Sequence, residues 1–130
     1  MSTYRIFLVC GALAAALAVT AGAFGAHALR GLDPALLSAY RLAVDYQFWH
    51  ALGLLALGSL GVQFGPSRTL LAAGWLMLVG MLLFSGSLYA MSLLGLRLGM
   101  ITPLGGLALI LAWLLLAWGL GRATFARRSG

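Results

Sequence analysis

Residues 69–96 read TLLAAGWLMLVGMLLFSGSLYAMSLLGL, and this stretch decides the fold because none of its 28 residues is charged. A transmembrane helix needs about 20 consecutive, mostly apolar residues, so the stretch is long enough to cross a bilayer. It is rich in Leu and Ala and lacks the alternation of apolar and polar residues that marks a strand of a membrane β-barrel. The sequence therefore predicts a transmembrane helix here.

Three further uncharged stretches repeat this pattern along the chain. They contain 24, 22 and 24 residues and lie between residues 5 and 30, 45 and 68, and 97 and 122. Each is long enough to span. The sequence thus predicts an all-α integral membrane four-helix bundle that forms a single domain over residues 1–130. The predicted spans are about 6–27, 47–64, 70–91 and 104–121.

The overall composition agrees with a protein that lies in lipid. Of the 130 residues, 63% are hydrophobic and 8% are charged, whereas about a quarter of a soluble domain is charged. The net charge of +6 comes from arginines that stand between apolar runs, not from a basic stripe of the kind that binds nucleic acid. Cys10 is the single cysteine and allows no intrachain disulfide. These features exclude a cytosolic enzyme, a nucleic-acid-binding module and a disulfide-stapled secreted domain.

The arginines also predict the orientation, because basic residues are enriched on the cytoplasmic side of membrane proteins. With four spans, the side that holds both termini carries Arg5, Arg68, Arg122, Arg127 and Arg128. The other side carries Arg30, Arg41 and Arg97. Five arginines against three favour a multi-pass protein of the bacterial inner (cytoplasmic) membrane with both termini in the cytoplasm.

The segment between the first two spans has the pattern of a helix. Asp33 suits an N-cap and Pro34 the first helical position. Apolar residues then recur on one face and polar residues on another; they are Leu37, Tyr40 and Val44, and Ser38, Arg41 and Asp45. The pattern predicts a short amphipathic helix over about 34–45, at the membrane surface or folded back onto the bundle, that leads into the second span.

Small residues form stripes in the first and fourth spans, where they allow helix backbones to approach closely in lipid. The stripes are Gly11, Ala15, Ala18, Gly22 and Gly25, and Gly105, Ala108 and Ala112. They predict packing within one chain or, alternatively, a homo-oligomer.

Polar residues are few and gather, in the predicted topology, at the outer ends of the spans. They are His27, Gln47, His50, Ser85, Ser87, Tyr89 and Thr102. Because lipid offers such groups no partners, we expect Gln47, His50, Ser85 or Ser87, and Thr102 to form one hydrogen-bonded cluster, with His27 close by. Two interpretations stay open: the cluster locks the helix ends together, or it forms a site for a ligand, a lipid headgroup or an ion.

Catalysis and metal binding find little support in the same residues. Two histidines without further ligands make a poor zinc site, and Cys10 precedes His27 by 17 residues, about 25 Å of helix. The chain contains no Glu, and no carboxylate falls inside a predicted span. We therefore expect no catalytic residues, no metal and no cofactor, and a protein that is not an enzyme.

Four segments resemble the signatures of a known family. They are Gly22–Leu29 (GAFGAHAL), Tyr46–Leu52 (YQFWHAL), Phe84–Tyr89 (FSGSLY) and Ile101–Gly106 (ITPLGG). In this order they resemble the YgdD/YwdK-type family of small bacterial inner-membrane proteins, which has a eukaryotic transmembrane-protein relative. The resemblance implies a four-helix membrane protein of unknown function, without an established activity or cofactor.

The sequence therefore predicts a small, non-enzymatic inner-membrane protein that binds a lipid or small amphiphile at the polar cluster. Its expected partners are membrane lipids and not nucleic acid. The alternatives are an oligomeric transporter or channel, and an accessory subunit of a larger membrane complex.

Overall fold

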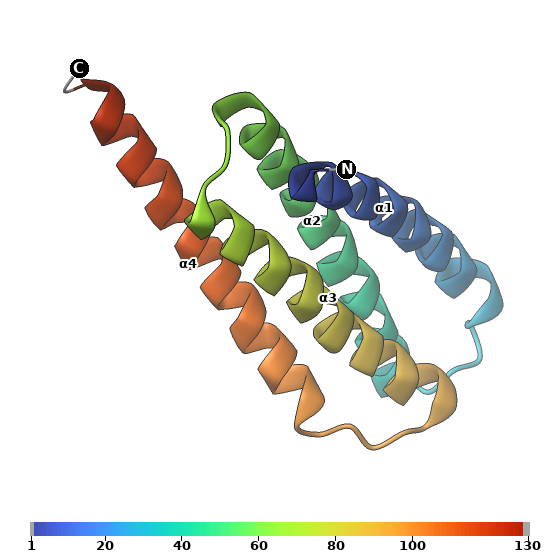
Figure 1. The fold of residues 1–130 in the computed structure, drawn as a ribbon. Coiled ribbons are helices and arrows are strands. Elements are labelled where there is room, and N and C mark those ends of the chain that lie inside the picture. Colours follow the sequence, from blue (N-terminus) through green and yellow to red (C-terminus); the bar gives the residue numbers. More distant parts are fainter. Residues whose placement is uncertain (1, 129–130) are drawn as a thin grey trace.

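The computed structural model describes residues 2–128, with side chains up to Arg122. The described chain folds into four helices, which confirms the all-α prediction (Figure 1). They are α1 (Thr3–Ala28), α2 (Pro34–Phe64), α3 (Arg68–Leu94) and α4 (Ile101–Arg128). By length and composition α1, α3 and the Ile101–Arg122 part of α4 are able to cross a membrane. α2 is long enough but more polar, since it contains Arg41, Asp45, Gln47, His50 and Gln63.

The predicted start of the segment after the first span is confirmed. The Asp33 side chain accepts hydrogen bonds from the backbone N–H groups of Ala35 (2.9 Å) and Leu36 (3.4 Å), and Pro34 occupies the first helical turn. The cap satisfies two of the donors that a helix N-terminus leaves unpaired. At the other end of α2, Gly65 has a φ of 87° and so lets the chain turn sharply into α3.

The separate short amphipathic helix predicted over about 34–45 is wrong, because these residues are the first turns of the continuous helix α2. No Gly or Pro occurs from residue 35 to residue 52, so nothing in the sequence breaks the helix there. These turns pack lengthwise against α1. The Tyr40 hydroxyl donates a hydrogen bond to the carbonyl oxygen of Ala21 (2.6 Å), and the Tyr40 ring fills the space beside Gly25.

The helices pack mainly as consecutive pairs, α1 on α2, α2 on α3 and α3 on α4. α1 and α4 lie on opposite sides of the α2–α3 pair (Figure 1). The largest fully buried side chains, Phe7, Leu54, Leu57 and Met77, come from the first three helices. The fourth helix therefore covers α3 and leaves one side of α2 open.

The small-residue stripes pack within the chain, as one of the two interpretations predicted. A Cβ on Gly11 would lie 2.8 Å from the carbonyl oxygen of Ala51, and one on Gly105 would overlap the backbone of Phe84. Ala18 and Ala112 are buried in the same helix contacts. These glycines let the backbones of α1 and α2, and of α3 and α4, come close together. Gly11 and Gly105 are thus used for helix packing within one chain.

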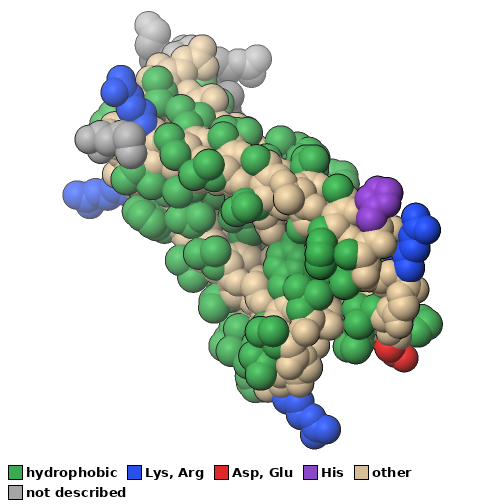
Figure 2. Space-filling view, turned by 90° about the vertical axis from the view of Figure 1, so that its right-hand side faces the viewer, with side chains coloured by type: hydrophobic (Ala, Val, Ile, Leu, Met, Phe, Trp, Pro, Cys, Tyr) green, Lys and Arg blue, Asp and Glu red, His purple; other side chains and the backbone are tan. Residues whose placement is uncertain are grey.

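Apolar side chains cover the middle of the molecule, and arginines lie at its ends (Figure 2). Leu13 of α1, Leu82 of α3 and Leu114 of α4 are each at least 60% exposed. A monomeric soluble protein rarely exposes so large an apolar surface. The surface is that of a chain whose solvent is hydrocarbon.

Candidate functional site

An apolar groove lies between α2 and α4 and is floored by α3. Its cavity volume is about 640 Å³, within the usual range for ligand sites. α2 contributes Tyr46, Trp49 and His50, and α3 contributes Phe84. α4 contributes Gly106, Leu109, Ile110 and Trp113. We call it the α2–α4 groove.

The part of the groove around His50 and Trp113 lies at mid-length of the packed helices. A Cβ on Gly53, one turn after His50, would lie 3.2 Å from the Trp113 ring. On the opposite side of α2, Ala51 lies against Gly11 of α1. Each of these residues is at least about two helical turns from the nearest end of its helix. The sequence predicted that His50 lies near the start of the second helix, but α2 begins at Pro34, so His50 lies 16 residues beyond that start.

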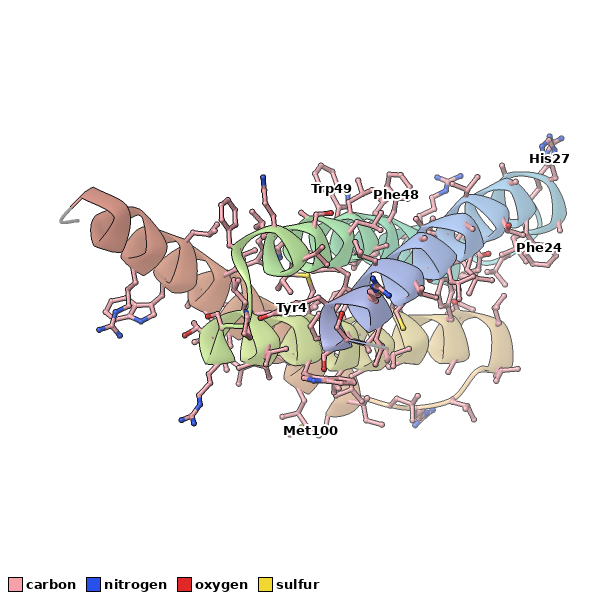
Figure 3. The ribbon with its side chains drawn as sticks, turned by 45° about the horizontal axis from the view of Figure 1, so that its top comes forward. Tyr4, Phe24, His27, Phe48, Trp49 and Met100 are labelled. Carbon is pink, nitrogen blue, oxygen red and sulfur yellow. The ribbon has the colours of Figure 1, made fainter. Side chains whose placement is uncertain are left out.

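Aromatic rings form most of the walls of the groove. Tyr46 stacks on Phe84, with ring centroids 4.5 Å apart. The His50 ring lies 5.7 Å from the Tyr46 ring and 6.1 Å from the Trp113 ring. Trp49, 68% exposed, points away from α2 at the rim (Figure 3). The aromatic rings of the walls thus present flat, polarisable surfaces to an apolar ligand.

His50 is the one polar side chain that the groove buries, at 6% exposure. Its Nδ1 lies 2.6 Å from the carbonyl oxygen of Tyr46. A carbonyl oxygen only accepts hydrogen bonds, so Nδ1 must carry the proton and donate it. The other ring nitrogen, Nε2, makes no hydrogen bond to a described residue. It is not among the fully buried unpaired atoms, so it reaches the accessible surface where His50 lines the groove.

Gln47 makes its hydrogen bond on a different side of α2. Its side-chain amide donates to the carbonyl oxygen of Ala14 in α1, at 2.9 Å. The bond satisfies a polar side chain inside an apolar helix contact. Gln47 and His50, expected in one cluster, thus contact different parts of the molecule.

Ser87 and Thr102 do form a predicted contact and join α3 to α4. Their hydroxyl oxygens are 2.6 Å apart. Ser87 also bonds to the Phe84 carbonyl oxygen at 2.9 Å and, having one hydroxyl proton, must donate it there. Thr102 therefore donates to Ser87. Of the hydrogen bonds between predicted site residues, this is the one that the described structure contains.

Ser85 and Tyr89 lie one turn apart on α3. Among the described residues, neither hydroxyl has a hydrogen-bond partner, and both are buried. The Tyr89 ring packs edge-on against Tyr40 of α2, with centroids 5.3 Å apart. Tyr89 thus belongs to the contact between α2 and α3.

His27 is exposed at the end of α1, far from Trp49, the neighbour of His50 in α2 (Figure 3). It follows Gly11, which lies level with Ala51, by 16 residues, or about 24 Å of helix. The prediction that His27 lies close to the cluster is therefore wrong. The sequence placed these residues at one end because it placed the start of the second span near residue 47, whereas α2 begins at Pro34.

The sequence analysis missed the aromatic walls, and one signal was available. Tyr46, Trp49 and His50 have the spacing i, i+3, i+4, which places them on one face of a helix. The roles of Phe84 and Trp113 depend on how α3 and α4 pack, which the sequence pattern does not encode. Within the described residues, no three His, Cys, Asp or Glu side chains come together as metal ligands.

Comparison with known proteins agrees with the groove's setting in a membrane protein. The family described as "Protein of unknown function (DUF423)" matches residues 21–106, which include Tyr46, His50 and Phe84. The UPF0382 membrane protein YwdK of Bacillus subtilis is 44% identical over 86% of this chain and 93% of its own length. A UPF0382 membrane protein of Staphylococcus saprophyticus is 44% identical over 88% of this chain and 96% of its own. No solved structure matches this chain.

Proposed function

The chain belongs to the DUF423 (UPF0382) family of membrane proteins of unknown function, and on that premise we propose a binding role for the α2–α4 groove. The protein spans the bacterial inner membrane four times as a single domain. Its groove holds a lipid or another small amphiphile, and the role is not enzymatic.

The proposed membrane placement rests on how the helices pack. α2 is too polar to be identified as a span by composition, yet it packs along α1 and α3, which are apolar enough to cross. Its polar side chains Gln47 and His50 both make hydrogen bonds to backbone carbonyls, as buried polar groups in a bilayer must. Centring the bilayer on these helices places His50 near its midplane.

The arginine count supports both termini in the cytoplasm. Five arginines belong to that side and three to the other; the side chains of Arg127 and Arg128 lie outside the described residues. Arg30 donates to the Ala26 carbonyl oxygen at the end of α1. Arg122 lies over the Trp118 ring, 5.3 Å from its centroid, near the opposite end of the bundle.

One observation carries the binding role: a buried imidazole presents an unpaired nitrogen to an apolar groove. Lipid chains cannot hydrogen-bond to Nε2, and an unsatisfied polar atom is costly in hydrocarbon. Polar groups at membrane depth are, for this reason, candidate functional sites. An amphiphile would satisfy Nε2 with its polar group and cover the aromatic walls with its apolar part.

Filling the groove tests the binding role. Gly106 lines it, and a Cβ there would make ordinary contact with Phe84 at 3.6 Å. Gly106→Leu should therefore preserve the fold while its side chain occupies the groove, and lipid retained by the purified protein in native mass spectrometry should be lost. Gly86→Leu is the matched control, because a Cβ on Gly86 enters open space. Equal lipid retention by both variants would contradict the proposal.

A further inference from the structure

The Tyr46 carbonyl oxygen determines whether His50 acts toward a ligand as a hydrogen-bond donor or as an acceptor. At 2.6 Å from that oxygen, Nδ1 holds the ring's proton, so Nε2 of the neutral imidazole is a bare acceptor. A backbone carbonyl that fixes the tautomer of a histidine in this way is a common means of orienting the ring. The groove therefore presents an acceptor and not a donor.

The groove also lacks any charge that would support the imidazolium form or an ionic guest. None of its described lining residues is Asp, Glu, Lys or Arg. A protonated His50 would be a buried cation without a counter-ion, which is costly in an apolar site. A carboxylate or phosphate guest would have no cation to pair with.

Neighbouring side chains do not satisfy Nε2 within the described structure. Tyr46 and Trp113 carry donor groups and contact the His50 ring through their own rings, and neither donates a hydrogen bond to it. The Gln47 amide donates to the carbonyl oxygen of Ala14 in α1, on a different side of α2, and makes no hydrogen bond to His50. The acceptor thus remains available to a molecule that enters between α2 and α4.

We propose that the α2–α4 groove selects a neutral amphiphile whose polar group is a hydroxyl, and that this hydroxyl donates a hydrogen bond to Nε2 of His50. The inference rests on the binding role proposed above and adds the chemical class of the ligand. The hydroxyl can belong to a long-chain alcohol or to a phenol with an apolar tail. The stacked rings of Tyr46 and Phe84 and the Trp113 ring cover the apolar part of either one.

Four probes of similar size separate the possible ligands: 1-dodecanol, 4-octylphenol, 2-dodecanone and dodecylamine. Each is titrated into the ¹⁵N-labelled full chain in lipid bicelles. The Gly106 amide signal reports occupancy of the groove, and the imidazole nitrogen signals report the hydrogen bond. The His27→Gln background leaves His50 as the single histidine.

We expect dodecanol, octylphenol or both to move the Gly106 and Nε2 signals and to bind about fivefold more tightly than dodecanone, a difference typical of one hydrogen bond. The ranking of dodecanol and octylphenol tells an alcohol site from a phenol site. His50→Phe, which keeps an aromatic ring and removes the acceptor, should abolish the preference over dodecanone. A purely structural role of His50 would leave that preference unchanged.

Two results would overturn the inference while leaving the binding role intact: equal affinities for dodecanol and dodecanone, or tightest binding of dodecylamine. If no probe moves the Gly106 signal, the proposal that the ligand carries a hydroxyl group is also wrong. The lipid retention of Gly106→Leu then decides separately whether the groove binds any amphiphile.

Discussion

Tyr4 and Ser67 exchange two hydrogen bonds across the contact between the start of α1 and the turn before α3. The Tyr4 hydroxyl donates to the carbonyl oxygen of Ser67 at 3.2 Å and accepts from its backbone N–H at 2.8 Å. The Tyr4 ring lies in the space that Gly61 leaves beside α2. One side chain thus fastens the first helix to the connection between the second and third.

Tyr4→Phe should therefore destabilise the fold, because it leaves two backbone groups of the turn without their partner. We expect a loss of about 1–3 kcal/mol in the free energy of unfolding, measured by denaturation in mixed micelles. Tyr46→Phe is the control, since the Tyr46 hydroxyl makes no hydrogen bond within the described structure. Equal stability of the two variants would show that the Tyr4 hydrogen bonds contribute little.

Two glycines of α3 should respond in opposite directions to the same substitution. A Cβ on Gly74 would overlap the buried Phe7 ring, whereas one on Gly86 meets nothing within 4 Å. Gly74→Ala should cost about 1–3 kcal/mol by overpacking. Gly86→Ala should stabilise the helix by up to about 1 kcal/mol. Thermal unfolding in detergent compares them, and a stabilising Gly74→Ala would mean that α1 does not pack on α3 at Phe7.

The Ser87–Thr102 hydrogen bond predicts energetic coupling between α3 and α4. In a double-mutant cycle, Ser87→Ala combined with Thr102→Val should cost less than the sum of the two single substitutions, by about 0.5–1.5 kcal/mol. The control combines Ser59→Ala with Thr102→Val. The two effects should be additive, because the exposed Ser59 hydroxyl donates within its own helix to the Leu55 carbonyl oxygen. Strict additivity would indicate that the two hydroxyls do not meet in the membrane.

The proposed orientation predicts that a fluorescent protein fused after Gly130 is active and that alkaline phosphatase fused there is not. The reason is the excess of arginines on the side of both termini. Fusions in the 96–99 connection should give the reverse pattern. Phosphatase activity at Gly130 would contradict the orientation but leave the packing of the helices untouched.

The sequence predicted where α3 and the helical segment after the first span begin, because a charged or capping residue lies at each of these turns. Arg68 begins α3, and Asp33 with Pro34 begins α2, as the capping pattern required. It did not predict that α2 is continuous, since Arg41 and Asp45 are typical of a surface segment. Charges report polarity but not where a helix ends, and the 35–52 stretch contains no residue that would end it.

The candidate site was predicted only in part, for a geometric reason. Residues three apart on a helix differ by about 60° in direction. This angle is enough for Gln47 to reach Ala14 of α1 while His50 faces Trp113 of α4. The sequence identified the polar residues, but their partners depend on which helix covers each face. The pairing of Ser87 with Thr102 was predictable because a short connection links their two helices.

The position of the proton on His50 decides whether the α2–α4 groove presents a hydrogen-bond acceptor. Solid-state ¹⁵N NMR of the His27→Gln protein in lipid bilayers, where His50 is the only histidine, distinguishes a protonated ring nitrogen from a bare one. We expect a neutral ring in which Nδ1 carries the proton and donates it to the Tyr46 carbonyl oxygen, while Nε2 is an acceptor. A proton on Nε2, with Nδ1 bare, or a doubly protonated ring would contradict it.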